Sequence, residues 1–104
     1  MTTFDERENA YENKFVHDEE LRFKATARRN KLLGLWAAGL LGKTGADADA
    51  YAREVIIAEM EEEGDEDVYR KVSGDLGAHA SEATIRAKMS DLLIEAKRQV
   101  LTEG

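Results

Sequence analysis

The sequence predicts an all-α fold, a four-helix bundle preceded by an N-terminal arm, and three observations support that prediction. Proline is absent from the 104 residues, while the helix formers alanine, leucine, glutamate, lysine and arginine are abundant. Apolar residues recur three and four positions apart, and no run alternates with the period of two that is typical of a strand. Short connections that contain glycine separate the periodic stretches. Helices joined by short connections pack roughly antiparallel, and we expect this for neighbouring helices here.

The first helical stretch, residues 4–16, differs from the rest because few of its side chains could join a core. Its large side chains are three aromatics on one helical face: Phe4, Tyr11 and Phe15. The residues around them are charged or small, and an isolated helix this short is marginal in water. We therefore expect residues 1–17 to be an arm that becomes helical against another surface, and residues 18–104 to be the bundle. That surface is either the bundle itself or a groove on another protein.

The bundle is predicted from four further stretches. They span residues 18–41, 46–63, 65–72 and 82–102, with residues 73–80 as a loop or frayed turn. One face of the first of these helices carries Leu21, Ala25, Leu32, Trp36 and Leu40, and the half from residue 32 onwards, which is apolar on nearly all faces, should be central in the core. Gly34 and Gly39 lie inside that helix at a cost of about 1 kcal/mol each relative to alanine, and such glycines often let another helix approach closely. Gly42 and Gly45 should end it, and Ser81 should cap the last helix.

Charge is distributed in blocks along the chain, whose net charge is −7. Residues 1–20 sum to −5 and residues 44–67 to −9, whereas residues 21–43 hold six basic residues and no acid. The cations of the basic block either pair with acidic residues inside the fold or bind an external anion. The acidic total argues against nucleic-acid binding by the whole surface. The most apolar run, residues 32–41, is half of the ~20 residues that a membrane span needs, so we expect no direct membrane insertion.

The search for catalytic and metal chemistry finds little. His17 and His79 have no partner at metal-ligand spacing, and the chain has no cysteine. The acidic run 61–67 lacks the ligand order of a calcium loop. The segment 42–44 resembles the end of a phosphate-binding loop, but the glycine that this motif needs is Ala37, and the segment follows a helix rather than a strand. We therefore expect no enzyme, no metal site and no required cofactor.

The basic block remains as a candidate anion site. Its members could hold ADP or ATP weakly, through charge and through stacking on a tryptophan. They are Lys24, Arg28, Arg29, Lys31 and Trp36. The competing interpretation is that these cations pair within the fold and that the tryptophan belongs to the core.

Several segments together resemble the inhibitory zeta subunits of alphaproteobacterial F-type ATP synthases. The most specific is the block ARRNKLLGLWAAGLLG at residues 27–42. Similar segments are found at residues 4–8, 14–15, 19–25, 49–55 and 85–89. The resemblance covers essentially the whole chain.

The resemblance implies a four-helix bundle with a mobile N-terminal arm that inhibits ATP hydrolysis. In this family the arm enters a catalytic interface of the synthase head as a helix and blocks rotation. The expected partner-binding residues are Phe4, Arg7, Glu8, Tyr11, Lys14 and Phe15. The family is also associated with ADP or ATP binding to the bundle, which leaves a nucleotide sensor with the arm as a lid as the alternative function. The implied location is cytoplasmic, peripheral to the inner membrane through the synthase.

Overall fold

The computed structural model describes residues 19–60 and 65–103, and it confirms the all-α prediction for them. Four α-helices follow one another, with a 3-10 turn before the last. The helices are α2 (Glu19–Leu40), α3 (Gly45–Met60), α4 (Glu66–Leu76) and α5 (Glu82–Glu103), and the turn is η1 (Gly77–His79). The predicted arm helix, residues 4–16, lies outside the described residues.

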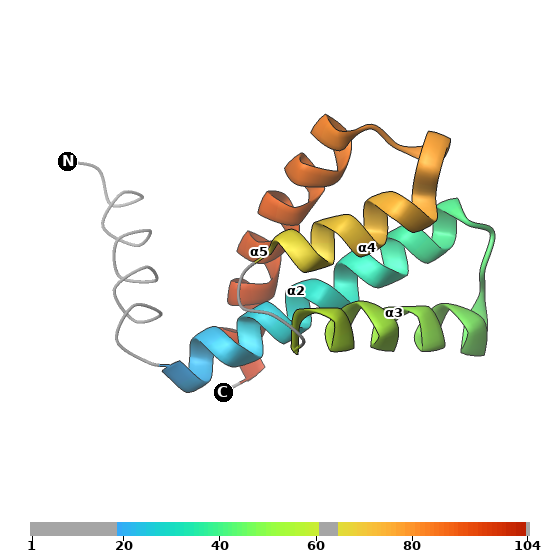
Figure 1. Ribbon diagram of the computed structural model, residues 1–104. Coiled ribbons are helices and arrows are strands. Elements are labelled where there is room, and N and C mark those ends of the chain that lie inside the picture. The colour runs from blue at the N-terminus through green and yellow to red at the C-terminus, as the bar shows by residue number, and fades with distance from the viewer. Residues whose placement is uncertain (1–18, 61–64, 104) are drawn as a thin grey trace.

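Helix α2 is central to the bundle, because it packs along α3 and α5 and also contacts α4 (Figure 1). Its buried residues form a broad band rather than one stripe. They are Ala25, Arg29, Asn30, Leu33, Gly34, Ala37 and Ala38. Of the five residues predicted to share one face, Ala25 is buried, Leu21 and Trp36 are partly buried against the core clusters, and Leu40 is 40% exposed. The half of α2 from residue 32 onwards is central in the core, as predicted, but it contributes many small side chains beside the large apolar ones.

The main core lies between α2 and the three other helices. It is built from Leu33, Ala37, Ala38, Tyr51, Val55, Val68, Val72, Leu76, Ile85 and Met89. A smaller cluster closes the other end, where Ala25 of α2 meets Val100 of α5. Burial of these side chains is the main force that holds the helices together.

Helix α2 ends where Gly42 was predicted to end it. Gly42 has a φ of +79°, which a glycine adopts without strain. The Lys43 N–H donates to the Ala38 carbonyl at 2.8 Å, and the Gly42 N–H donates to the Gly39 carbonyl at 3.2 Å. These two bonds form a Schellman cap. Gly45, in contrast, is the first residue of α3 rather than part of the stop.

The predicted close helix approach is found at Gly34 and not at Gly39. A Cβ atom added to Gly34 would lie 2.6 Å from the Cα of Ala52 in α3, whereas one added to Gly39 would meet nothing within 4 Å. The backbones of α2 and α3 therefore touch at Gly34.

Helix α4 is longer than predicted, and α5 begins as predicted. Val68, Val72 and Leu76 are buried at successive intervals of four residues, so the helix continues through residues 73–76, where the sequence predicts a loop. Exposed Gly74 within that segment breaks neither the helix nor the core. The Ser81 hydroxyl accepts a hydrogen bond from the Thr84 N–H at 3.2 Å, which confirms the predicted cap of α5.

Across residues 19–60 and 65–103, no helix is both long enough and apolar enough to cross a membrane.

Candidate functional site

The predicted partner-binding residues all lie in the arm, outside the described residues. They are Phe4, Arg7, Glu8, Tyr11, Lys14 and Phe15. The structure does describe the helix to which the arm is joined. The first turns of α2 extend beyond the end of α3, so the arm leaves the bundle at an end that only α5 flanks among the described helices (Figure 1).

Three members of the basic block act on one carboxylate at the end of α5. Arg28 donates to Gln99 at 2.8 Å and to Glu103 at 2.8 Å. The hydrogen bond from Arg28 lowers the pKa of Glu103. Burial opposes this change, and the charges of Arg28, Lys31 and Lys24 lower the pKa further, so the net pKa is lowered. Lys24 also pairs with Glu20 at 3.2 Å, one helical turn earlier.

Arg29 lies on another side of α2 and is occupied inside the fold. Its side chain is 2% exposed and donates to Asn30 at 2.7 Å and to Asp65 at 2.8 Å. A buried guanidinium is costly unless it is paired and hydrogen-bonded, and here both requirements are met. Arg29 therefore serves the bundle rather than a surface anion site.

Trp36 does not join these cations. It is half-buried beside the main core, and the Lys88 ammonium lies 5.9 Å from its ring centroid. The five residues predicted for a nucleotide site are thus brought together only in part, as Lys24, Arg28 and Lys31.

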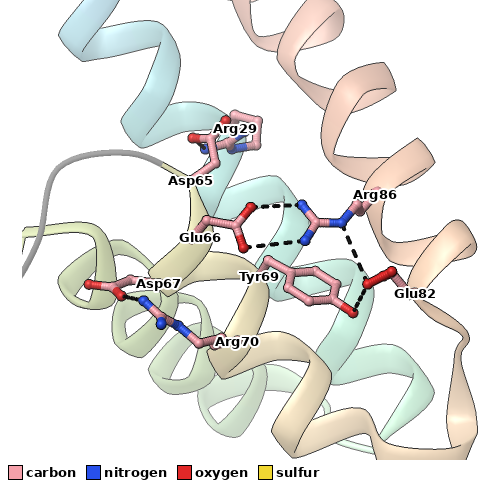
Figure 2. A network of polar contacts seen from close by, with 8 residues as sticks. All are labelled: Arg29, Asp65, Glu66, Asp67, Tyr69, Arg70, Glu82 and Arg86. Carbon is pink, nitrogen blue, oxygen red and sulfur yellow. Dashed lines mark hydrogen bonds and ion pairs between the residues drawn. The ribbon is translucent and has the colours of Figure 1, made fainter.

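Three consecutive acids at the start of α4 bind arginines on three different helices (Figure 2). Asp65 pairs with Arg29 of α2, Glu66 with Arg86 of α5, and Asp67 with Arg70 of α4 itself. The sequence predicts acids at this helix start, where they complement the helix dipole. It does not reveal the two links to other helices, because those depend on how the helices pack.

Arg86 is the centre of the link between α4 and α5. Its guanidinium donates two hydrogen bonds to Glu66, at 3.1 and 3.3 Å, and lies 3.9 Å from the Tyr69 ring centroid. Arg86 also pairs with Glu82 at 3.8 Å, and Glu82 accepts a hydrogen bond from the Tyr69 hydroxyl at 3.1 Å (Figure 2). The hydrogen bonds from Arg86 lower the pKa of Glu66.

A second network that the sequence does not reveal joins α3 to α4. The Tyr51 hydroxyl, on a side chain that is 3% exposed, donates to Asp75 at 2.9 Å, and Lys71 donates to the same carboxylate at 3.0 Å. Burial raises the pKa of Tyr51, and the hydrogen bond to Asp75 adds to that rise. Burial also raises the pKa of Asp75, but the hydrogen bonds from Lys71 and Tyr51 and the charges of Lys71 and Lys43 outweigh it, so the net pKa is lowered.

In the part of the chain that the structure describes, no group of three or more His, Cys, Asp or Glu side chains is arranged to hold a metal ion. His79 lies exposed in η1.

A protein-family model and a solved structure both match this chain. A family model described as ATPase inhibitor subunit zeta matches residues 1–99. A protein structure solved by solution NMR is 55% identical over 81% of this chain and 99% of its own, with a TM-score of 0.75. A search of curated protein sequences finds no match.

Proposed function

We propose, from the premise that this chain belongs to the ATPase inhibitor subunit zeta family, that its arm inhibits ATP hydrolysis by an F-type ATP synthase. The arm inserts as a helix into a catalytic interface of the synthase head and blocks rotation. The observation that carries the proposal is the extent of the family match, which begins at residue 1 and so includes the arm as well as the bundle. The protein would then act on the cytoplasmic side of the membrane, held there by the synthase.

The pattern of the arm suits binding of an amphipathic helix in a groove. Phe4, Tyr11 and Phe15 fall on one helical face, and large rigid aromatics are good anchors at such interfaces. Ordering the arm costs about 1–2 kcal/mol of conformational entropy per residue. Burial of each aromatic side chain stabilises the complex by about 1.5–3 kcal/mol. The aromatics alone are therefore not sufficient, and ion pairs from Arg7 and Lys14 and contacts of the bundle must add to them.

Alanine substitutions in the arm test this proposal. Tyr11→Ala and Phe4→Ala should each raise the concentration needed for half-inhibition of the cognate ATPase by about 10- to 100-fold, because each removes one large buried anchor. The bundle should keep its thermal melt. Ile57→Ala is the matched control, since Ile57 is an apolar residue on α3 that is 54% exposed. Full potency of both arm variants would exclude the arm as the inhibitory element.

Nucleotide sensing remains the second candidate, because exposed Lys24 and Lys31 lie one turn before and one turn after Arg28, which binds the Glu103 carboxylate at 2.8 Å. Cations that act together on a carboxylate can also bind a phosphate. On this proposal ADP or ATP is a weak ligand, and titration with ATP should shift the backbone amide signals of residues 24–31 and 99–103. If ATP shifts none of these amides at millimolar concentration, this candidate is rejected.

A further inference from the structure

The first turns of α2 extend past the helix that covers the rest of the same face. Helices α2 and α3 run antiparallel and touch where Gly34 meets Ala52. Met60, the last residue of α3, is eight positions beyond Ala52, so α3 ends level with about residue 26 of α2. Residues 19–26, which we call the α2 extension, therefore project past α3, and their apolar contacts are with the end of α5 (Figure 1).

A small apolar cluster joins the α2 extension to the last two turns of α5. Ala25 and Val100 are buried together, and Leu21 and Leu101 are partly buried beside them. Among the described residues of α2, the first that joins the main core is Leu33. Because an isolated helix of about two turns is marginal in water, the α2 extension depends on the smaller cluster for its helical structure.

An ion pair closes the same contact between α2 and α5. Arg28, just after the α2 extension, donates to Glu103 and to the side-chain oxygen of Gln99, both at 2.8 Å. Gln99 in turn donates to Glu95 at 3.0 Å, which holds its amide with the oxygen toward Arg28. The Arg28 side chain is only 27% exposed, so water screens this pair less than it screens a fully exposed one.

The position of Glu103 makes the pair important to α5 as well. Glu103 lies in the last turn of α5, where the helix dipole disfavours a negative charge, and that turn carries no basic residue. Arg28 supplies the missing positive charge from α2. The two helix ends therefore stabilise each other, since α5 ends on a cation of α2 and the α2 extension rests on α5.

We propose that the last two turns of α5 are a latch, which keeps the α2 extension helical and fixes the direction in which the preceding chain leaves the bundle. Arg28 and Glu103 are its positioning residues, and Val100 is its apolar contact.

The inference rests on the proposed function, in which residues 1–17 bind the synthase. A binding segment attached to a fixed helix loses less conformational freedom on binding than one attached to a frayed helix end. The latch therefore increases the potency of the inhibitor without itself touching the synthase.

Amide hydrogen exchange of the free protein tests the latch without the synthase. Glu103→Gln removes the charge and keeps the size of the side chain. The amides of residues 23–28 should then exchange about two- to fivefold faster, the factor that corresponds to loss of a partly exposed ion pair. The amides of residues 33–38, in the part of α2 that belongs to the main core, should keep their rates.

Further variants test the two halves of the latch. Val100→Ala removes a buried apolar contact, so it should accelerate exchange of residues 23–28 by about tenfold or more. Arg28→Glu should also accelerate it, because two carboxylates then face each other. Adding Glu103→Arg to Arg28→Glu should restore slow exchange, since the two charges are then exchanged between the same positions. Such a rescue is not expected if each residue acts only on its own helix.

Two matched controls lie at exposed positions of α5. Asp91→Asn removes one negative charge, as Glu103→Gln does. Ile94→Ala shortens an apolar side chain that is 71% exposed, in contrast to buried Val100. Both controls should leave the exchange of residues 23–28 unchanged.

Three results would overturn the latch or part of it. If Glu103→Gln and Val100→Ala leave the exchange of residues 23–28 unchanged, the latch does not exist. If they accelerate residues 33–38 by the same factor, the bundle opens as a whole and the latch is again excluded. If Val100→Ala alone acts, the role given to Arg28 and Glu103 is refuted.

Inhibition assays keep this inference distinct from the proposed function. Val100→Ala should raise the concentration for half-inhibition by about threefold or more, which corresponds to a third or less of the molecules being latched, and Ile94→Ala should not. If Val100→Ala accelerates exchange while neither it nor the wild type inhibits the ATPase, the α2 extension is held as described but the proposed function fails. If Val100→Ala accelerates exchange and inhibits as well as the wild type, the proposed function stands and the latch has no part in it.

Discussion

Gly34 shows how one missing side chain sets the spacing of two helices. An added Cβ would lie 2.6 Å from a backbone atom of Ala52, which cannot move away as a flexible side chain could. The glycine costs helix propensity, and the close packing of α2 on α3 offsets that cost.

Gly34→Ala should therefore lower the free energy of unfolding by about 1–3 kcal/mol, because the two helices must separate. Gly39→Ala is the matched control in the same helix. Its Cβ meets nothing within 4 Å, so it should raise stability by up to about 1 kcal/mol through helix propensity. Urea titration followed by circular dichroism measures both. Equal effects of the two substitutions would mean that the close approach does not exist.

Arg29 is a second residue whose role depends on its neighbours. It is almost fully buried, while its partner Asp65 is 55% exposed, so the pair joins the interior of the bundle to the start of α4.

Asp65→Ala should lower the free energy of unfolding by about 1–3 kcal/mol, because it leaves a buried guanidinium without its counter-charge. Asp65→Asn keeps an acceptor and should cost less. Glu95→Ala breaks an exposed pair with Arg98 within one helix, and such pairs contribute about 0.5 kcal/mol or less. Chemical denaturation of the three variants measures the differences. A cost for Asp65→Ala no larger than that for Glu95→Ala would refute the role given to Arg29.

At the scale of elements, α4 is attached to its neighbours by polar links as well as by its apolar face. Tyr51 and Lys71 bind Asp75 between α3 and α4, and Arg86 binds Glu66 between α4 and α5. The link between α3 and α4 depends on pH in two ranges, because Asp75 titrates in acid and Tyr51 titrates in alkali.

Tyr51→Phe should cost about 1 kcal/mol at neutral pH, because it removes a buried hydrogen bond. The pKa of Tyr51 is raised in the folded state, so its contribution is present below the unfolded value of about 10 and is lost as the pH rises above it. The difference in unfolding free energy between wild type and Tyr51→Phe should therefore shrink above about pH 10. A difference that stays constant from pH 7 to pH 11 would contradict this account.

The same link weakens in acid for the opposite reason. The pKa of Asp75 is lowered in the folded state, so the stability that it contributes is present above its ordinary pKa of about 4 and is lost as the pH falls below that value. Asp75→Asn should flatten the fall in stability between about pH 4 and pH 2, as measured by urea titration at each pH. An unchanged slope in this variant would show that Asp75 does not stabilise the bundle through its charge.

The element boundaries show what the sequence could predict. Signals at the ends of helices were predictable from the sequence: Gly42 ends α2, and Ser81 caps α5. The extent of α4 was underestimated, because packing of Leu76 on the core outweighs the weak propensity of Ser73 and Gly74. The links from Asp65 and Glu66 to other helices could not be predicted, since sequence spacing carries no information on which helices meet.

At the scale of the whole molecule, the charge blocks of the sequence now have partners. Arg29 in the basic block pairs with Asp65 in the following acidic block, and Arg28 pairs with Glu103 near the C-terminus. Internal pairing therefore accounts for these two arginines, while Lys31 and Lys24, which pairs with Glu20, remain on the surface. The fold of the bundle was predictable from periodicity and glycine spacing. For the arm, the sequence predicts a helical pattern with aromatics on one face, and this segment lies outside the described residues.

The central claim is that the bundle is a stable carrier and that inhibition resides in the arm. The most direct test measures ATP hydrolysis by the cognate synthase head with the full-length chain and with a chain that lacks residues 1–16. The two should show similar cooperative melts by circular dichroism, since the described core lies within residues 19–103. We expect the full-length chain to inhibit and the shortened chain to have no effect at the same concentrations. Equal inhibition by the shortened chain would contradict the account.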